Sequence, residues 1–364
     1  MNSTLNHHTS RSAKIMLLTL AVFASGSCAT TPSAAVARAT AQAIVINEVL
    51  AHTDPPDVDS IELFNPGATP VDISGWYLSD DKKEPERFRI PSGTIVAAGG
   101  YHVFKVGNGS GELPFALSEF GEPVLLHAPG ASGDLQLVDA IEFGASPNGV
   151  ALGRYTTSTG AVHFPLLANV TLGAANALPR VGPVVINELM YAPSTGPEYL
   201  VLTNITDYPV QLFDPAHPEN TWQVRGIGDK NEDYALPQDF TLGARASVIL
   251  TADPDAYRAI HDGLGVPVVG PFPGKLSNEG ERIALLAPQP PESDKNYVSY
   301  YVVDEVSYGV ALPWPPAAAD QGDALQRIRL DAYGDDPINW RAGVGSYYAT
   351  DLALLPQLLR PASQ

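Results

Sequence analysis

The sequence of 364 residues contains a single cysteine, Cys28. One cysteine forms no disulfide within a chain, so folded domains here must be held together by their hydrophobic cores. The chain is long enough to build such cores. The apolar run of residues 15–24 is too short to cross a bilayer as a helix.

Basic residues are also scarce. The chain has 21 lysines and arginines against 40 aspartates and glutamates, which gives a formal net charge of −19. No segment is rich enough in lysine and arginine to neutralise a phosphate backbone. This balance excludes nucleic acid as the main partner and is typical of a soluble exported protein.

Catalytic motifs are missing as well. The sequence has no Gly-x-Ser-x-Gly elbow, no His-Glu-x-x-His helix and no glycine-rich phosphate loop. Its histidines beyond the first 28 residues do not pair at the short spacing of metal ligands. We therefore predict that the protein is not an enzyme.

The first 28 residues have the pattern of an export signal. Arg11 and Lys14 precede the apolar run, and no acidic residue occurs before Glu48. Cys28 follows in a context that resembles a bacterial lipobox, where the thiol would be acylated. The alternative is cleavage by an ordinary signal peptidase, which leaves a secreted protein. Both predict an extracellular or outer-surface location, with membrane contact only through a lipid on Cys28.

The rest of the chain contains an internal repeat. Ile-Val-Ile-Asn-Glu-Val-Leu at residues 44–50 returns as Val-Val-Ile-Asn-Glu-Leu-Met at residues 184–190. Four further blocks recur in the same order, among them residues 61–65 with 200–204 and residues 138–144 with 303–309. A repeat on this scale predicts two copies of one domain.

Short β-strands account for most of these blocks. They are four to eight residues long, rich in Val, Ile, Leu, Tyr and Phe, and bounded by turn residues. Residues 60–65 alternate between polar and apolar faces, as in a strand with one buried side. Helical periodicity is confined to residues 254–261, where Asp253 would cap the helix. Each copy is therefore predicted to be an antiparallel β-sandwich, with Trp76 and Trp222 in the two cores.

The blocks resemble a known family. The opening Ile-Asn-Glu, the run from Glu-Leu-Phe-Asn-Pro to Gly-Trp-Tyr-Leu-Ser-Asp in residues 62–80, and Leu-Ser-Asn-Glu-Gly-Glu at residues 276–281 are similar to the lamin-tail domain. The resemblance implies an immunoglobulin-like sandwich for each copy, hence an all-β chain of two tandem sandwiches. It also implies an accessory module, since bacterial domains of this kind accompany exported hydrolases or anchoring domains. The second copy departs from the pattern before Trp222, where the usual segment is stretched.

We expect six regions along the chain. They are a signal peptide in residues 1–28, a Thr/Pro/Ala stalk in 29–43, a first sandwich in 44–178, a linker in 179–183, a second sandwich in 184–345 and a tail in 346–364.

The Asn-Glu pair of each repeat is a candidate site because it recurs. The pairs are Asn47 with Glu48 and Asn187 with Glu188. At the end of a first strand, such side chains can bond loop backbone groups that a sheet leaves unpaired. We interpret the pairs as structural.

A cluster of acids offers the other candidate site. Asp54, Asp57 and Asp59 lie between the first two predicted strands, and calcium takes six to eight oxygen ligands. No EF-hand spacing is present, and Pro55-Pro56 fixes part of the loop. The acids are therefore either a calcium site or solvated turn residues.

These observations favour a non-enzymatic binding or structural module at the cell surface. Its partner would be a protein, a glycan or a surface polymer. A secreted metal-dependent hydrolase is the alternative and predicts that Asp54 to Asp59 converge in one pocket. A third reading is a structural spacer stiffened by calcium.

Overall fold

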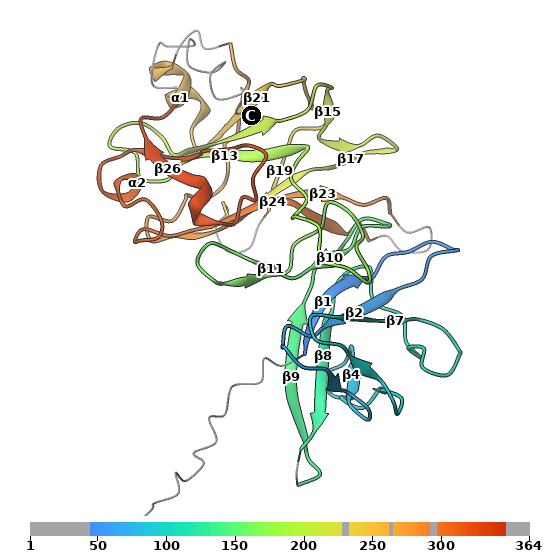
Figure 1. The fold of residues 1–364 in the computed structure, drawn as a ribbon. Coiled ribbons are helices and arrows are strands. Elements are labelled where there is room, and N and C mark those ends of the chain that lie inside the picture. The colour runs from blue at the N-terminus through green and yellow to red at the C-terminus, as the bar shows by residue number, and fades with distance from the viewer. Residues whose placement is uncertain (1–43, 131, 228–232, 262–264, 292–296, 347–364) are drawn as a thin grey trace, which may run out of the picture. The chain divides into compact units, whose positions relative to one another are not determined.

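The computed structural model describes residues 44–130, 132–227, 233–261, 265–291 and 297–346. Strands dominate these residues, and all strand pairs but one are antiparallel. Two large hydrophobic cores are built from different parts of the chain, residues 44–152 and residues 184–340. Figure 1 shows the strands of these two parts. The predicted all-β fold of two tandem immunoglobulin-like β-sandwiches is therefore confirmed.

The first sandwich packs two four-stranded sheets face to face, because apolar residues alternate along their strands. One sheet has the order β10 (Leu152–Gly153), β1 (Val45–Leu50), β2 (Ser60–Phe64), β7 (Tyr101–Lys105). The other has the order β5 (Phe88–Arg89), β4 (Tyr77–Ser79), β8 (Pro123–Pro129), β9 (Leu135–Glu142). Two small pairs complete it, β3 (Val71–Asp72) with β6 (Ile95–Val96) and β11 (Tyr155–Thr156) with β12 (Val162–His163).

The second sandwich repeats this plan with a wider first sheet. Its order is β22 (Val268–Val269), β21 (Ser247–Thr251), β14 (Tyr199–Asn204), β13 (Val184–Met190), β25 (Ala324–Arg327), β26 (Trp340–Gly343). The facing sheet has the order β19 (Tyr234–Ala235), β18 (Gln223–Arg225), β23 (Glu281–Pro288), β24 (Tyr300–Tyr308). β15 (Val210–Gln211) pairs with β20 (Thr241–Leu242).

The repeat extends to a backbone irregularity. The pairing of β1 with β2 shifts between Ile46 and Glu48, and that of β13 with β14 shifts between Ile186 and Glu188. A bulge of this kind inserts one extra residue into a strand. Ile46 and Val49, three positions apart, therefore both face the core. The Asn-Glu pair lies at this bulge in both copies.

The predicted helix is present as α1 (Pro254–Ile260), and the Asp253 carboxylate accepts a hydrogen bond from the Ala256 amide at 2.9 Å. Two further short helices, α2 (Ala317–Asp320) and the 3-10 turn η1 (Pro337–Asn339), were not predicted. They are too short to show a helical period. No helix in the described part of the chain is long and apolar enough to span a membrane.

The two tryptophans directly precede equivalent strands, β4 and β18, but they are buried to different extents. Trp222 is 7% exposed and belongs to the core of the second sandwich, whereas Trp76 is half-buried and packs against the rim of the first core. The stretch before Trp222 forms an added hairpin, β16 (Phe213–Asp214) with β17 (His217–Thr221). The insertion thus leaves the sandwich plan intact.

Candidate functional site

A partly buried ion pair lies beside the bulge of the first sandwich. The Arg154 guanidinium is paired with the Asp139 carboxylate, and both side chains are 18% exposed. Asp139 also accepts the Ile46 amide at 2.7 Å, while Arg154 Nε donates to the Ile46 carbonyl at 2.8 Å. The pair therefore bonds both backbone polar groups of Ile46, the last residue in register before the bulge.

The second sandwich has an equivalent ion pair that is more deeply buried. Arg327 Nη1 lies 2.6 Å from Asp304 Oδ2, with side-chain exposures of 0% and 4%. Asp304 accepts the Ile186 amide at 2.8 Å, and burial raises the pKa of Asp304 although Arg327 opposes that shift. Sequence reasoning missed both pairs. The signal was available in the repeat, because Asp139 and Asp304 lie in matched blocks.

Glu48 holds a segment that crosses the outer face of its sheet. This segment, residues 166–178, is called the strap. The Glu48 carboxylate accepts the Thr171 amide at 2.8 Å and the Thr171 hydroxyl at 2.5 Å. Opposite Glu48 in the sheet, Glu62 accepts the Gly173 amide and, at 2.7 Å, the Asn47 side-chain amide. Burial raises the pKa of both glutamates, and the charge of Glu48 raises that of Glu62 further.

Glu188 plays the corresponding part in the second sandwich. It accepts the Ser346 amide at 3.1 Å, the Tyr199 hydroxyl at 2.7 Å and the Gln326 side-chain amide at 3.1 Å. Burial raises its pKa. Asn187 beside it is half-buried and lines a groove on the outer face of the sheet. Both Asn-Glu pairs thus lie where a chain segment meets the sheet.

The structure does not bring Asp54, Asp57 and Asp59 together. Asp54 is exposed and accepts a hydrogen bond from the Asn148 side chain, and Asp57 is exposed. Asp59 accepts the Thr53 hydroxyl at 2.8 Å. Within the described ranges, no group of three or more His, Cys, Asp or Glu side chains is placed to hold a metal ion.

Asp59 has a structural partner that the repeat explains. Its carboxylate accepts the Leu117 amide at 2.9 Å, and in the second sandwich Glu198 accepts the Leu276 amide at 2.6 Å. Leu117 and Leu276 open matched blocks of the repeat. The two acids therefore anchor the same turn.

Cys28, the signal segment and the stalk lie outside the described residues, as does the tail after Ser346. Their predicted roles rest on the sequence.

A polar cleft of about 670 Å³ lies between residues of the two sandwiches. Three arginines line it, Arg180, Arg225 and Arg282, together with Tyr297 and Tyr300. Acids from the second sandwich hold two of these arginines. Asp233 binds Arg225 through two nitrogens at 2.7–3.1 Å, and Glu305 accepts Arg282 Nε at 2.7 Å.

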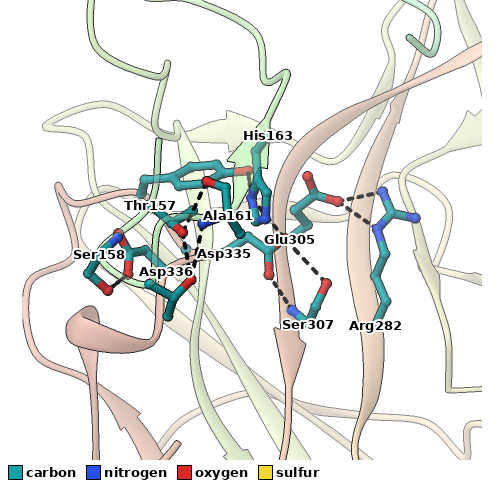
Figure 2. Close-up of polar contacts among 12 residues, drawn as sticks. Thr157, Ser158, Ala161, His163, Arg282, Glu305, Ser307, Asp335 and Asp336 are labelled. Carbon is teal, nitrogen blue, oxygen red and sulfur yellow. Dashed lines mark hydrogen bonds and ion pairs between the residues drawn. The ribbon is translucent and has the colours of Figure 1, made fainter. Parts of the chain in front are cut away.

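A hairpin of the first sandwich contacts the second sandwich (Figure 2), and His163 of this hairpin and Asp335 of the second sandwich both line the cleft. Ser158, at the tip of the β11–β12 hairpin, donates its amide to Asp336 at 2.8 Å. His163 Nδ1 lies 3.2 Å from the Tyr333 hydroxyl and 3.4 Å from Asp335. Asp335 in turn accepts the Ser307 amide at 2.5 Å. The cleft is thus bounded by side chains with defined partners.

The fold and these sites define a class, an immunoglobulin-like β-sandwich protein with a polar cleft. Such a fold is typically non-catalytic. Residues 37–145 match the model of the Lamin Tail Domain family. This match includes strands β1 to β9 and supports a protein that contains a lamin tail domain. No curated protein matches the chain in a sequence comparison.

Proposed function

We propose that this protein is an exported, non-enzymatic binding module that holds a glycan or similar surface polymer in the cleft between its two sandwiches. In this proposal both sandwiches, residues 44–178 and 184–345, are lamin-tail-like domains. The observation that carries the proposal is the cleft itself, because tyrosine rings and arginines paired with acids line it together.

The chemistry of the cleft suits a sugar chain. Tyrosine rings offer flat apolar faces with a polar edge, which match the alternating surfaces of a pyranose ring. Tyr297 is 58% exposed and packs edge-on against Phe120 at 5.6 Å between ring centroids. This contact fixes the ring while leaving most of it open to a ligand.

The arginines supply directional hydrogen bonds. A guanidinium presents planar donors, and a carboxylate at its other edge fixes the plane of that group. Arg282 with Glu305 forms such a unit, in which the acid binds Nε and Nη2 of the guanidinium and Nη1 would donate to the ligand. Sugar hydroxyls both donate and accept, so an acid–arginine pair can bond two of them.

Isothermal titration calorimetry with soluble polysaccharides measures binding affinity and tests this proposal. Arg282→Ala and Tyr300→Ala should each weaken binding about tenfold or more, since each removes a group that would be buried under the ligand. Arg329→Ala is the matched control, because Arg329 pairs with Asp331 on the exposed surface and does not line the cleft. Equal losses in all three variants, or no binding of any glycan, would refute the assignment of the cleft.

Export and lipidation form a separate part of the proposal. The support is the order of Arg11, Lys14, the apolar run and Cys28 in the sequence. Mass spectrometry of the mature N-terminus after expression in a bacterial host tests it. An acylated Cys28 supports a lipid anchor, whereas a start elsewhere before residue 44 supports secretion alone. An intact Met1 would refute both.

A further inference from the structure

A groove of about 350 Å³ lies on the second sandwich, away from the cleft. Its lining is mostly apolar. Residues on strands of the six-stranded sheet contribute Asn187, Thr203 and Ser247, and Pro267, Ile328 and Leu330 come from flanking segments. Leu202 and Val248, the neighbours of Thr203 and Ser247, point into the core, so the groove lies on the outer face of the sheet.

Two substitutions between the repeats open this groove. In the first sandwich, Phe64 and Tyr101 are directly opposite each other, and their rings stack at 4.7 Å between centroids. The register of the second sandwich places Thr203 and Ser247 at the same two positions. Their hydroxyls bond each other at 2.9 Å. Two aromatic rings are thus replaced by two small side chains.

The strap covers the corresponding face of the first sandwich. Along the strap, Thr171 first donates its amide to Glu48, and Gly173 then donates its amide to Glu62. Asn176 then donates to the carbonyls of Asn47 at 3.0 Å and Arg154 at 3.1 Å. By register, Asn187 and Arg327 are the equivalents of Asn47 and Arg154, and both line the groove.

The described part of the second sandwich ends at Ser346, at the position that corresponds to Thr171 of the strap. Ser346 bonds Glu188 as Thr171 bonds Glu48, and Glu188 adjoins Asn187 in the sequence. Beyond Ser346 the chain continues for 18 residues, which include Leu352-Ala353-Leu354-Leu355 and Leu358-Leu359. At up to about 3.3 Å per residue, this length is more than enough to cross a groove that begins one residue from the anchor.

We propose that the tail, residues 347–364, binds in this groove as a second strap. The leucines of the tail would fill the space that the Phe64–Tyr101 pair and the strap fill in the first sandwich. They would also cover apolar groups at the rim, where Ile328 is 43% exposed. The occupant is the chain's own tail, because the bond between Ser346 and Glu188 holds the start of the tail beside the groove.

Hydrogen exchange of the chain from residue 29 onward tests the tail. Docking slows exchange of the tail amides and of the amides of residues 265 and 266 by about tenfold or more compared with a Leu354→Asp/Leu355→Asp variant. Leu312→Asp is the matched control, since Leu312 is 83% exposed and does not line the groove. Tail amides that exchange as fast as a free peptide would overturn the proposal.

Two further measurements identify the occupant. A chain that ends after Ser346 should bind a synthetic peptide of residues 347–364, and Thr203→Phe/Ser247→Tyr in that chain should abolish binding by filling the groove. Protection that rises with protein concentration would overturn the proposal in favour of a second copy's tail. No peptide binding to a folded truncated chain would also overturn it.

Discussion

The two sandwiches are built on the same plan, each around its own core, and they differ on the outer face of one sheet. Both place the Asn-Glu pair at a bulge and bond an Asp–Arg pair to the strand beside it. On the outer face, the first sandwich has two buried glutamates, stacked aromatic rings and the strap. The second has one glutamate and a groove. The comparison indicates that the two copies keep the bulge and the Asp–Arg pair, which belong to the fold. They differ in the side chains on the outer face of the sheet, where another chain segment binds.

The largest expected difference between the copies concerns the Asp–Arg pairs. Arg327→Met leaves Asp304 buried without its partner, which should reduce the free energy of unfolding by about 3–5 kcal/mol. Arg154→Met should cost less, about 1.5–3 kcal/mol, because its pair is 18% exposed and water reaches Asp139. Urea unfolding of each variant measures both values. Equal costs would show that depth of burial does not distinguish the pairs.

The tryptophans give the next difference. Trp222→Ala removes a side chain that is 7% exposed and leaves a cavity in the larger core, at a cost of about 3–5 kcal/mol. Trp76→Ala should cost clearly less because Trp76 is half-buried at the rim of its core. Thermal unfolding followed by near-ultraviolet circular dichroism checks the order. The reverse order would mean that the first core depends on its rim.

Periodic apolar patterns made the strands and the repeat predictable from sequence. The structure has a strand, β2, in the alternating segment 60–65 and turns at the block ends, as these local rules predict. The alternation also predicted that only one side of this strand is buried, and that was wrong. Ser60 and Glu62 are buried too, and Glu62 lies under the strap, where it accepts the Gly173 amide.

The role of the Asp139–Arg154 pair was not predictable from such local patterns. The backbone that Asp139 bonds belongs to Ile46, which is 93 residues away in the sequence. Long-range partners of a charge leave no local pattern.

The cleft and the groove were beyond sequence reasoning for a related reason. The groove exists because Thr203 and Ser247 oppose each other, and only the strand register shows that they replace an aromatic pair. The cleft depends on contacts such as Ser158 with Asp336, which are 178 residues apart. A repeat reveals equivalent residues, but it does not reveal how two copies meet.

The asparagines of the signature should respond differently to truncation. Asn47→Ala removes side-chain bonds to Glu62 at 2.7 Å and to Asn176 at 2.6 Å, and should cost about 1–3 kcal/mol. In a chain that ends after Ser346, Asn187→Ala removes a half-buried side chain at the groove and should cost about 1 kcal/mol or less. Parallel urea titrations compare the two variants. A larger loss for Asn187→Ala in the full chain than in the shortened chain would support the tail as the occupant of the groove.

The paired acids under the strap predict a pH dependence. Burial raises the pKa of Glu48 and Glu62, so the folded state holds protons that the unfolded chain has already released. Stability from these groups is therefore full below the usual glutamate pKa of about 4.3 and declines as pH rises through the folded values. Glu62→Gln removes one of these titrations and should make the decline shallower as pH rises above about 4.3. An unchanged slope in the melting temperature would contradict the assignment.

The smallest effect is expected at Asp57. Its side chain is exposed in the loop before β2, whereas Asp59 in the same loop accepts the Leu117 amide as Glu198 accepts the Leu276 amide in the second sandwich. Asp57→Asn should therefore change stability by less than about 0.5 kcal/mol, with calcium or with chelator. Asp59→Ala should cost about 1–3 kcal/mol in both conditions, because it leaves the Leu117 amide without its acceptor.

Thermal unfolding in calcium and in chelator separates the two explanations of this loop. If the acids only form turns, the loss at Asp59 is the same in both solutions, since a hydrogen bond to a backbone amide needs no ion. A calcium site would instead raise the melting temperature of the unchanged protein through binding to the folded state. It would also make the Asp57 variant lose that rise. Such a result would set the first sandwich apart from the second by a metal as well as by a strap.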